Sequence, residues 1–348
     1  MGVVTVPNFR NDSLETGDVS GTSKHYCEQL ELGHILLFTE TPFPLTPDDR
    51  QFLLDVRQSS AQYHKNISYR PGEDRIRGVD RSGLDVKTLQ NIMRTYSRNV
   101  SAFVRTFLSP YAKGVRLDFA SFRPIEEQDR KMPIKARNDL LHVDAFPTRP
   151  TNGDRILRVF TNIHPTRPRG WVTGDTFKIL AAQMAADSGL PAIARQSRSS
   201  LQRALHQVNL LLRKMGVPVK DRSPYDKFML LFHDYLKQNE HYQKACPKYY
   251  SSFAPNSTWL VYTDMVPHAA LFGQFALEHT FIVPTSALLR PDCAPVHILE
   301  SLAGVSLTHT TSVRPAASPP RQKRSGSDWR AKNENVFPTD GSVRDNPR

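Results

Sequence analysis

Apolar residues recur at three- and four-residue steps in two long parts of the chain, and this period predicts helices. Thr46 followed by Pro47 predicts a helix start, because threonine caps a helix and proline fits its first turn. We expect a helical layer over about 46–110 and a helical insert over about 176–245. The clearest apolar face follows Asp85 and consists of Val86, Leu89, Ile92, Met93, Tyr96, Val100, Phe103, Val104 and Phe107. A second face, within the insert, consists of Leu201, Leu205, Val208, Leu211, Leu212 and Met215.

Between and after the helical parts, short runs alternate apolar and polar residues, which predicts strands. Core strands are expected at about 113–165 and 255–290, in the runs GVRLDFASFRPI, DLLHVDAF, RILRVFTNI, STWLVYTDMV and FALEHTFIVP. Helices, strands, a helical insert and further strands then follow one another along the chain. This order predicts an α+β fold with one β-rich domain at about 26–312.

The two ends of the chain differ from this domain. Residues 1–25 are polar and lack periodicity, so we expect a flexible arm. Residues 313–348 are rich in Pro, Ser and Arg and contain almost no aliphatic residues. Such a composition cannot bury enough surface to offset the entropy of ordering, so we expect a disordered basic tail.

Composition narrows the class of protein. The 348 residues are 39% hydrophobic, which is enough for a core, and contain only three cysteines, widely spaced. No disulfide framework or transmembrane run is predicted, and a reducing, cytoplasmic compartment fits best. The net charge of +12 favours an anionic partner. No nucleic-acid-reading motif accompanies this charge, so no specific nucleic acid is expected.

One constellation of residues could hold a metal. His142 and Asp144 are two apart in a strand-like run, and residues i and i+2 of a strand point to the same face. His-x-Asp is common by chance, and a salt-bridged surface pair is the simpler interpretation. With one distant histidine, for which His268 after the run TWLVYTDMV is the candidate, the set becomes two histidines and one carboxylate. Such a set binds Fe(II) and leaves open positions.

The open positions on Fe(II) would bind a 2-oxo acid, as cosubstrate, and O₂. The run RILRVFTNI supplies a candidate for binding the 2-oxo acid. Alternation places Arg158, Phe160 and Asn162 on one face of this strand. An arginine among apolar neighbours is costly unless an anion meets it, and a carboxylate matches its geometry. We therefore expect Arg158 to hold the distal carboxylate of 2-oxoglutarate, with Phe160 and Asn162 beside it. A pairing of Arg158 with solvent or an acidic side chain is the alternative.

Three segments resemble one known family: NDLLHVDAFPTRPTNGDRILRVFTNIHP, the region of Trp171, and WLVYTDMVPHAALFGQFALEHTF. They are similar to the 3-deoxy-D-manno-oct-2-ulosonic acid (Kdo) 3-hydroxylases, and the similarity extends over about residues 30–310. The resemblance implies a double-stranded β-helix, or jelly-roll, core. It also implies hydroxylation of Kdo at C3 to give Ko in the lipopolysaccharide inner core, using Fe(II), 2-oxoglutarate and O₂.

The resemblance extends to individual residues. His142 and Asp144 match the family's His-x-Asp motif, and His268 matches its distal histidine. Enzymes of this superfamily often place the 2-oxoglutarate arginine about ten residues after the distal histidine. This chain has no arginine there, so Arg155 and Arg290 remain alternatives to Arg158.

The resemblance also gives the positive charge a use. It implies an anionic, lipid-linked acceptor, Kdo-lipid A, and peripheral contact with the cytoplasmic leaflet of the inner membrane. Arg123 and Arg137 are the candidates for binding the acceptor. A non-catalytic jelly-roll module that binds sugar or lipopolysaccharide is the alternative, and a nucleic-acid-binding protein is a third. The sequence leaves the oligomeric state open.

Overall fold

The computed structural model describes residues 2–7, 19–57, 66–79, 84–128, 132–199, 208–209, 211–212, 215–216 and 222–309. The predicted tail at 313–348 lies outside these residues. So do Leu201 and Leu205 of the insert's predicted apolar face. Its residues Val208, Leu211 and Met215 are described and are exposed, not packed in the core.

Eight strands form the larger of two sheets, in the order β1-β2-β9-β6-β11-β5-β3-β4. Strand β1 pairs with β2 in parallel, and every other neighbouring pair is antiparallel. The central strands are those predicted from the sequence, but β6, β9 and β11 are buried on both sides and not on one apolar side alone. The strands are β1 Val3–Val6, β2 Ile35–Phe38, β3 Ile67–Arg70, β4 Arg75–Arg77, β5 Arg116–Arg123, β6 Arg155–Asn162, β9 Thr258–Tyr262 and β11 Ala276–Val283.

Three strands form the smaller sheet, in the order β10-β7-β8 with antiparallel pairing. They are β7 Arg169–Thr173, β8 Tyr249–Phe253 and β10 His268–Phe272. Aromatic rings join this sheet to the larger one. Phe253 of β8 stacks on Trp259 of β9 with ring centres 3.9 Å apart, and Trp171 of β7 meets Phe160 of β6 at 4.8 Å. The two sheets therefore pack against each other through a buried aromatic cluster.

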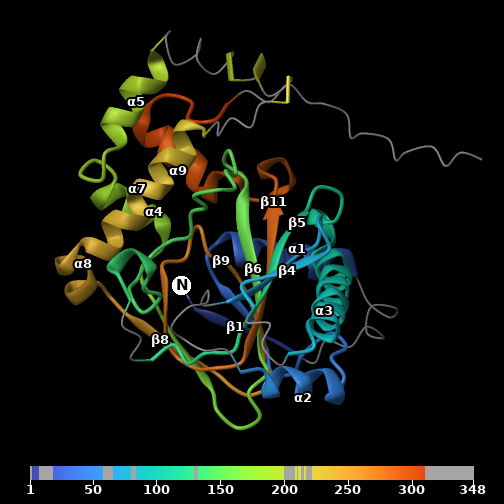
Figure 1. Ribbon diagram of the computed structural model, residues 1–348. Coiled ribbons are helices and arrows are strands. Elements are labelled where there is room, and N and C mark those ends of the chain that lie inside the picture. The colour runs from blue at the N-terminus through green and yellow to red at the C-terminus, as the bar shows by residue number, and fades with distance from the viewer. Residues whose placement is uncertain are drawn as a thin grey trace, which may run out of the picture. The chain divides into compact units, whose positions relative to one another are not determined.

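The helices lie in two groups (Figure 1). The first group contains α1 Val19–Glu31, α2 Pro47–Asp55 and α3 Val86–Phe107. Helix α3 begins at its cap Asp85, as predicted, and packs its apolar face against β3, β4 and β5. The second group contains α4 Phe177–Met184, α5 Leu190–Arg198, α7 Pro224–Gln238, α8 Glu240–Ala245 and α9 Pro295–Ala303.

Helices α4, α5, α7 and α8 lie within the range expected for the insert, in the chain between β7 and β8, two neighbouring strands of the smaller sheet. One buried carboxylate joins the insert to the loop before β6. Asp226 of α7 accepts hydrogen bonds from the backbone N–H of Thr151 at 2.7 Å and from that of Asn152. These residues belong to the loop that precedes β6, so α7 is fixed close to the segment that carries His142 and Asp144.

Two predictions about local structure are wrong. The run DLLHVDAF at 139–146 is not a strand, because His142 makes only an isolated β-bridge with His268 and Asp144 bonds instead to the carbonyl of Thr263. Residues 1–25 are not uniformly irregular. Residues Val3–Val6 pair with β2, and α1 begins at Val19. No helix among the described residues is long and apolar enough to cross a bilayer.

Candidate metal centre and its cavity

A cavity of about 380 Å³ opens between the two sheets. Strands β5, β6 and β11 form one wall, β7 and β10 form another, and α7 contributes to a third. Charged side chains dominate the lining: Arg123, Lys135, Arg149, Arg158, Arg169 and Lys237 carry positive charge, and Asp144 and Glu278 carry negative charge.

His142, Asp144 and His268 meet in this cavity. Each offers one ligand atom, and these atoms lie within 4.8 Å of one another. The β-bridge between His142 and His268 brings the two rings together, with centres 4.8 Å apart. The extended backbone then places Asp144 beside them, with its Oδ1 3.8 Å from Nε2 of His142. The structure therefore brings together the three predicted ligands, although the segment of the first two is not a regular strand.

Hydrogen bonds fix which nitrogen of each imidazole faces the cavity. Nδ1 of His142 lies 2.7 Å from the carbonyl oxygen of Leu140, and Nδ1 of His268 lies 2.9 Å from that of Val266. A carbonyl only accepts, so each Nδ1 donates and each Nε2 keeps its lone pair. Burial lowers the pKa of both imidazoles, and their mutual repulsion lowers that of His142 further. Both rings are thus neutral and oriented as metal ligands.

Asp144 is held as a carboxylate. Burial alone would raise the pKa of this carboxyl group, but the Arg158 guanidinium and the two imidazoles bring it below its usual range. Nε of Arg158 forms an ion pair with Oδ2 of Asp144 at 2.9 Å. Oδ1 is the oxygen nearer to His142. The donor set of two neutral nitrogens and one charged oxygen suits a divalent transition metal such as Fe(II).

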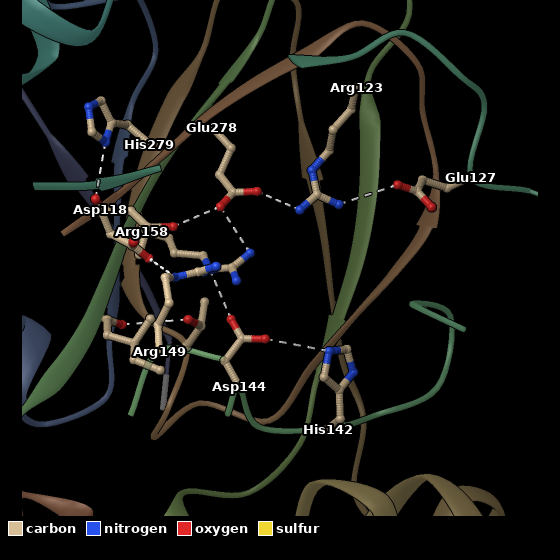
Figure 2. Close-up of polar contacts among 12 residues, drawn as sticks. Asp118, Arg123, Glu127, His142, Asp144, Arg149, Arg158, Glu278 and His279 are labelled. Carbon is tan, nitrogen blue, oxygen red and sulfur yellow. Dashed lines mark hydrogen bonds and ion pairs between the residues drawn. The ribbon is translucent and has the colours of Figure 1, made fainter. Parts of the chain in front are cut away.

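Beyond Asp144, ionic side chains form a connected network (Figure 2). Glu278 of β11 lies between Arg158 and Arg123, and contacts Arg158 at 3.0 Å. Glu127 lies between Arg123 and Arg169. Arg149 pairs with Asp118 at 2.8 Å. Each of these four guanidinium groups thus has a carboxylate partner, and the network is electrically balanced.

Helix α7 adds two cavity residues, His233 and Lys237, that sequence reasoning did not assign to the site. Nδ1 of His233 donates to the carbonyl of Val143, and its ring packs edge-on against His142 at 4.9 Å. Lys237 follows one turn later on the same helical face. Burial lowers the pKa of both groups. The four-residue spacing is a signal in the sequence, but nothing there shows that this face reaches the metal ligands.

Of the other predicted site residues, some line the cavity and some do not. Phe160, like Arg158, lines the cavity, in agreement with the predicted alternation of β6. Asn162 does not line it, because its amide donates to the carbonyls of Arg167 and Phe253. Arg137 is also outside the cavity wall, where it pairs with Asp139.

The two alternative anchors for the cosubstrate are outside the cavity wall as well. Arg155 is fully buried and pairs with Asp264 at 2.8 Å, since residue 155 belongs to the opposite face of β6 from Arg158. Arg290 is near the surface and pairs with Asp292.

Comparison with known proteins identifies the family. A sequence profile of the 3-deoxy-D-manno-oct-2-ulosonic acid (Kdo) hydroxylases matches residues 15–306. The chain belongs to the Kdo hydroxylase family. This confirms the resemblance found in the sequence. No match among curated proteins was found.

Solved structures of another member of the Kdo hydroxylase family agree in fold. The Kdo hydroxylase KdoO, a non-heme Fe(II) α-ketoglutarate-dependent dioxygenase in complex with α-ketoglutarate and Fe(III), is 32% identical with a TM-score of 0.73. The match covers 90% of this chain and all of KdoO. The apo structure of KdoO is 31% identical over the same shares, with a TM-score of 0.74. The family is thus one of iron-dependent oxidoreductases with a mixed α+β fold.

Proposed function

We propose that this protein hydroxylates Kdo at C3, giving Ko in the lipopolysaccharide inner core, in a reaction that consumes 2-oxoglutarate and O₂ at Fe(II). The observation that carries the proposal is the meeting of His142, Asp144 and His268 within 4.8 Å in a charged cavity. C3 of a 3-deoxy sugar is a methylene, whose C–H bonds no protein acid or base can activate. A metal that activates O₂ supplies this chemistry when it is bound.

The protein's own residues prepare the site for this metal. His142 and His268 present Nε2 atoms whose direction is fixed by the carbonyls behind them, and Arg158 keeps Asp144 ionised. Trp171 stacks on the ring of His268 at 5.1 Å and limits its movement. Trp171, Phe160 and Ala270 add apolar surface to the cavity wall and exclude water beside the ligands. We further propose that the two packed sheets form the core of a double-stranded β-helix.

We propose that Arg158 faces the distal carboxylate of 2-oxoglutarate, with Phe160 as apolar wall. Arg158 lies in the same cavity wall as the three candidate ligands and pairs with Asp144 at 2.9 Å. Its contacts with Asp144 and Glu278 use Nε and Nη1, and a guanidinium has five N–H donors. Donors on Nη2 therefore remain for a ligand. Arg123 lies on the far side of Glu278 and extends the positive wall.

Loading the metal and cosubstrate tests this function. Anaerobic addition of Fe(II) and 2-oxoglutarate to wild-type protein is expected to give a visible charge-transfer band. H142A and H268A are expected to abolish the band and the O₂-dependent formation of succinate, because each removes a ligand. H297A, which changes an exposed histidine outside the cavity, serves as the control. A folded wild-type protein with no band and no succinate would contradict the proposal.

The product identifies the position of hydroxylation. Incubation with Kdo-lipid A is expected to raise the acceptor's mass by one oxygen atom, and NMR of the released sugar should show that the C3 methylene has become CHOH. The alternative, a non-catalytic jelly-roll module, predicts lipopolysaccharide binding that H142A leaves unchanged and no oxygen transfer. The full set of three oriented ligands favours the enzyme.

A further inference from the structure

Lys237 is a buried cation whose role neither the metal site nor the arginine network explains. Its side chain lines the cavity, yet the residue is only 5% exposed. Nζ donates one hydrogen bond, at 3.0 Å, to the carbonyl oxygen of Lys135. An ammonium has three donors, and among the described residues no carboxylate lies within ion-pair distance of Nζ. Burying a charge without a counter-ion costs folding free energy, so Lys237 is placed to meet an anion from outside.

The charges around the cavity indicate the charge that this anion should carry. Six cations line the wall, and ion pairs connect five of them to carboxylates: Arg123, Arg149, Arg158, Arg169 and Lys135. The partners are also five in number: Glu278, Glu127, Asp118, Asp144 and Asp234. A divalent metal and dianionic 2-oxoglutarate would add charges that cancel each other. Lys237 is then the one uncompensated charge, and one further monoanion would neutralise the loaded site.

We propose that Lys237 binds the carboxylate of the acceptor sugar and so places the reacting carbon at the metal. This inference rests on the proposed function, because it takes Kdo as the acceptor. In Kdo the carboxylate is attached to C2, and C2 is bonded to C3. The group that binds the carboxylate must therefore lie within a few ångströms of the carbon that reacts. Lys237 meets this condition, because it lines the same cavity as His142 and lies one turn from His233, whose ring packs against that of His142 with centres 4.9 Å apart.

Helix α7 of the insert positions Lys237 beside the candidate metal ligands. His233 and Lys237 lie one turn apart on α7, and the bond from His233 to the carbonyl of Val143 fixes this face against the segment between the ligands His142 and Asp144. Lys135 also lines the cavity, but its side chain is 69% exposed and pairs with Asp234. It is therefore a lysine at the same cavity whose charge is already compensated, and it provides a matched control.

The test compares two ligands on protein loaded with Co(II) and 2-oxoglutarate, so that no turnover is needed. One is the methyl glycoside of Kdo, and the other is its carboxyl-reduced analogue, in which a primary alcohol replaces the carboxylate. Calorimetry is expected to show that the wild type prefers the acid. In K237M the Kd of the acid should rise at least about tenfold while that of the alcohol stays the same, since one charge-assisted hydrogen bond is lost. K237R should retain the preference for the acid, and K135M should behave as wild type.

The outcomes separate this inference from the proposed function. A wild-type preference for the acid that survives in K237M, or that K135M reduces as much, would overturn the role of Lys237 while the enzyme assignment stands. Wild-type protein that binds neither sugar would overturn both. Protein that binds no Co(II) but prefers the acid through Lys237 would contradict the hydroxylase and the placing of a reacting carbon at a metal, and would leave only the contact of Lys237 with the carboxylate. The Co(II) absorption spectrum of K237M shows whether its metal site is intact.

Discussion

His279 shows how one strand divides its residues between two environments. It follows Glu278 on β11, but its ring lies on the opposite side of the sheet from the cavity, where Nε2 is 2.8 Å from Oγ of Ser97 on α3. Nδ1 lies 3.1 Å from the carbonyl oxygen of Thr280. The ring is fully buried, and burial lowers its pKa to about 4. His279 is therefore a structural histidine beneath the site.

This burial predicts a pH dependence of stability. Between pH 6.5 and about 4 the unfolded chain binds a proton at residue 279 that the folded chain does not. The free energy of unfolding should therefore fall as the pH decreases through this range, by up to about 3 kcal/mol from His279. Urea titrations of the wild type and H279Q between pH 4 and 7.5 check this.

H279Q lacks the titrating group, so its free energy of unfolding should depend less on pH than that of the wild type. The exposed control H297Q should follow the wild-type profile. Parallel profiles for the wild type and H279Q would show that residue 279 does not resist protonation in the folded protein.

The sequence predicted the three candidate ligands that the structure brings together, but not every residue around them. His142 and Asp144 are near each other in the chain, and a strand followed by His268 was visible, so chemistry and spacing sufficed. Strand register brings Glu278 to the cavity. Helix α7, about 90 residues from the His-x-Asp motif, brings His233 and Lys237 there. No local pattern encodes these contacts, because they depend on how the insert packs.

At the scale of elements, helix α7 connects the insert to the site. Its residue Asp226 is buried and accepts from the N–H groups of Thr151 and Asn152 and from the hydroxyl of Ser223. This one carboxylate accepts from Ser223, the N-cap of α7, and fixes the loop before β6. The position of Lys237, three turns further along, depends on it.

D226A is expected to lower the free energy of unfolding by about 2–4 kcal/mol, because it leaves several buried donors without an acceptor. D234A on the same helix removes an ion pair with the exposed Lys135 and should cost at most about 1 kcal/mol. Urea denaturation measures both changes. Equal losses in the two variants would show that Asp226 does not anchor the insert.

Elements with strong local signals were predicted well. Asp85 and Thr46 accept from backbone N–H groups at the starts of α3 and α2, and both helices begin where these caps indicate. The strands with sustained alternation, β5, β6, β9 and β11, also form. The run at 139–146 shares their composition but forms a β-bridge only at His142, because the backbone groups on either side bond to the side chains of Gln243 and His233. Tertiary context decided this segment.

At the scale of the whole molecule, the excess of positive charge remains the main feature without a local explanation. The net charge is +12, of which residues 313–348 carry eight basic and four acidic side chains and so contribute +4. The cavity accounts for one further uncompensated cation, Lys237. Most of the excess is therefore available for long-range attraction to an anionic surface.

We propose that this charge brings the protein to an anionic membrane surface, and this proposal predicts a salt dependence. The protein is expected to sediment with vesicles that contain anionic lipid at 50 mM NaCl and to be released at about 500 mM, where charges are screened within a few ångströms. Vesicles of neutral lipid provide the control. Equal sedimentation with both kinds of vesicle, or no release by salt, would contradict an electrostatic contact.

The insert leaves the smaller sheet at the end of β7 and returns at the start of its neighbour β8. Because its two ends lie side by side, the sheet itself places no limit on the length of what lies between. Within the insert, Asp226 and His233 still hold the segments around the site in place. The reaction centre can thus stay unaltered while this excursion diverges, which lets such a scaffold acquire a different acceptor without rebuilding its catalytic chemistry.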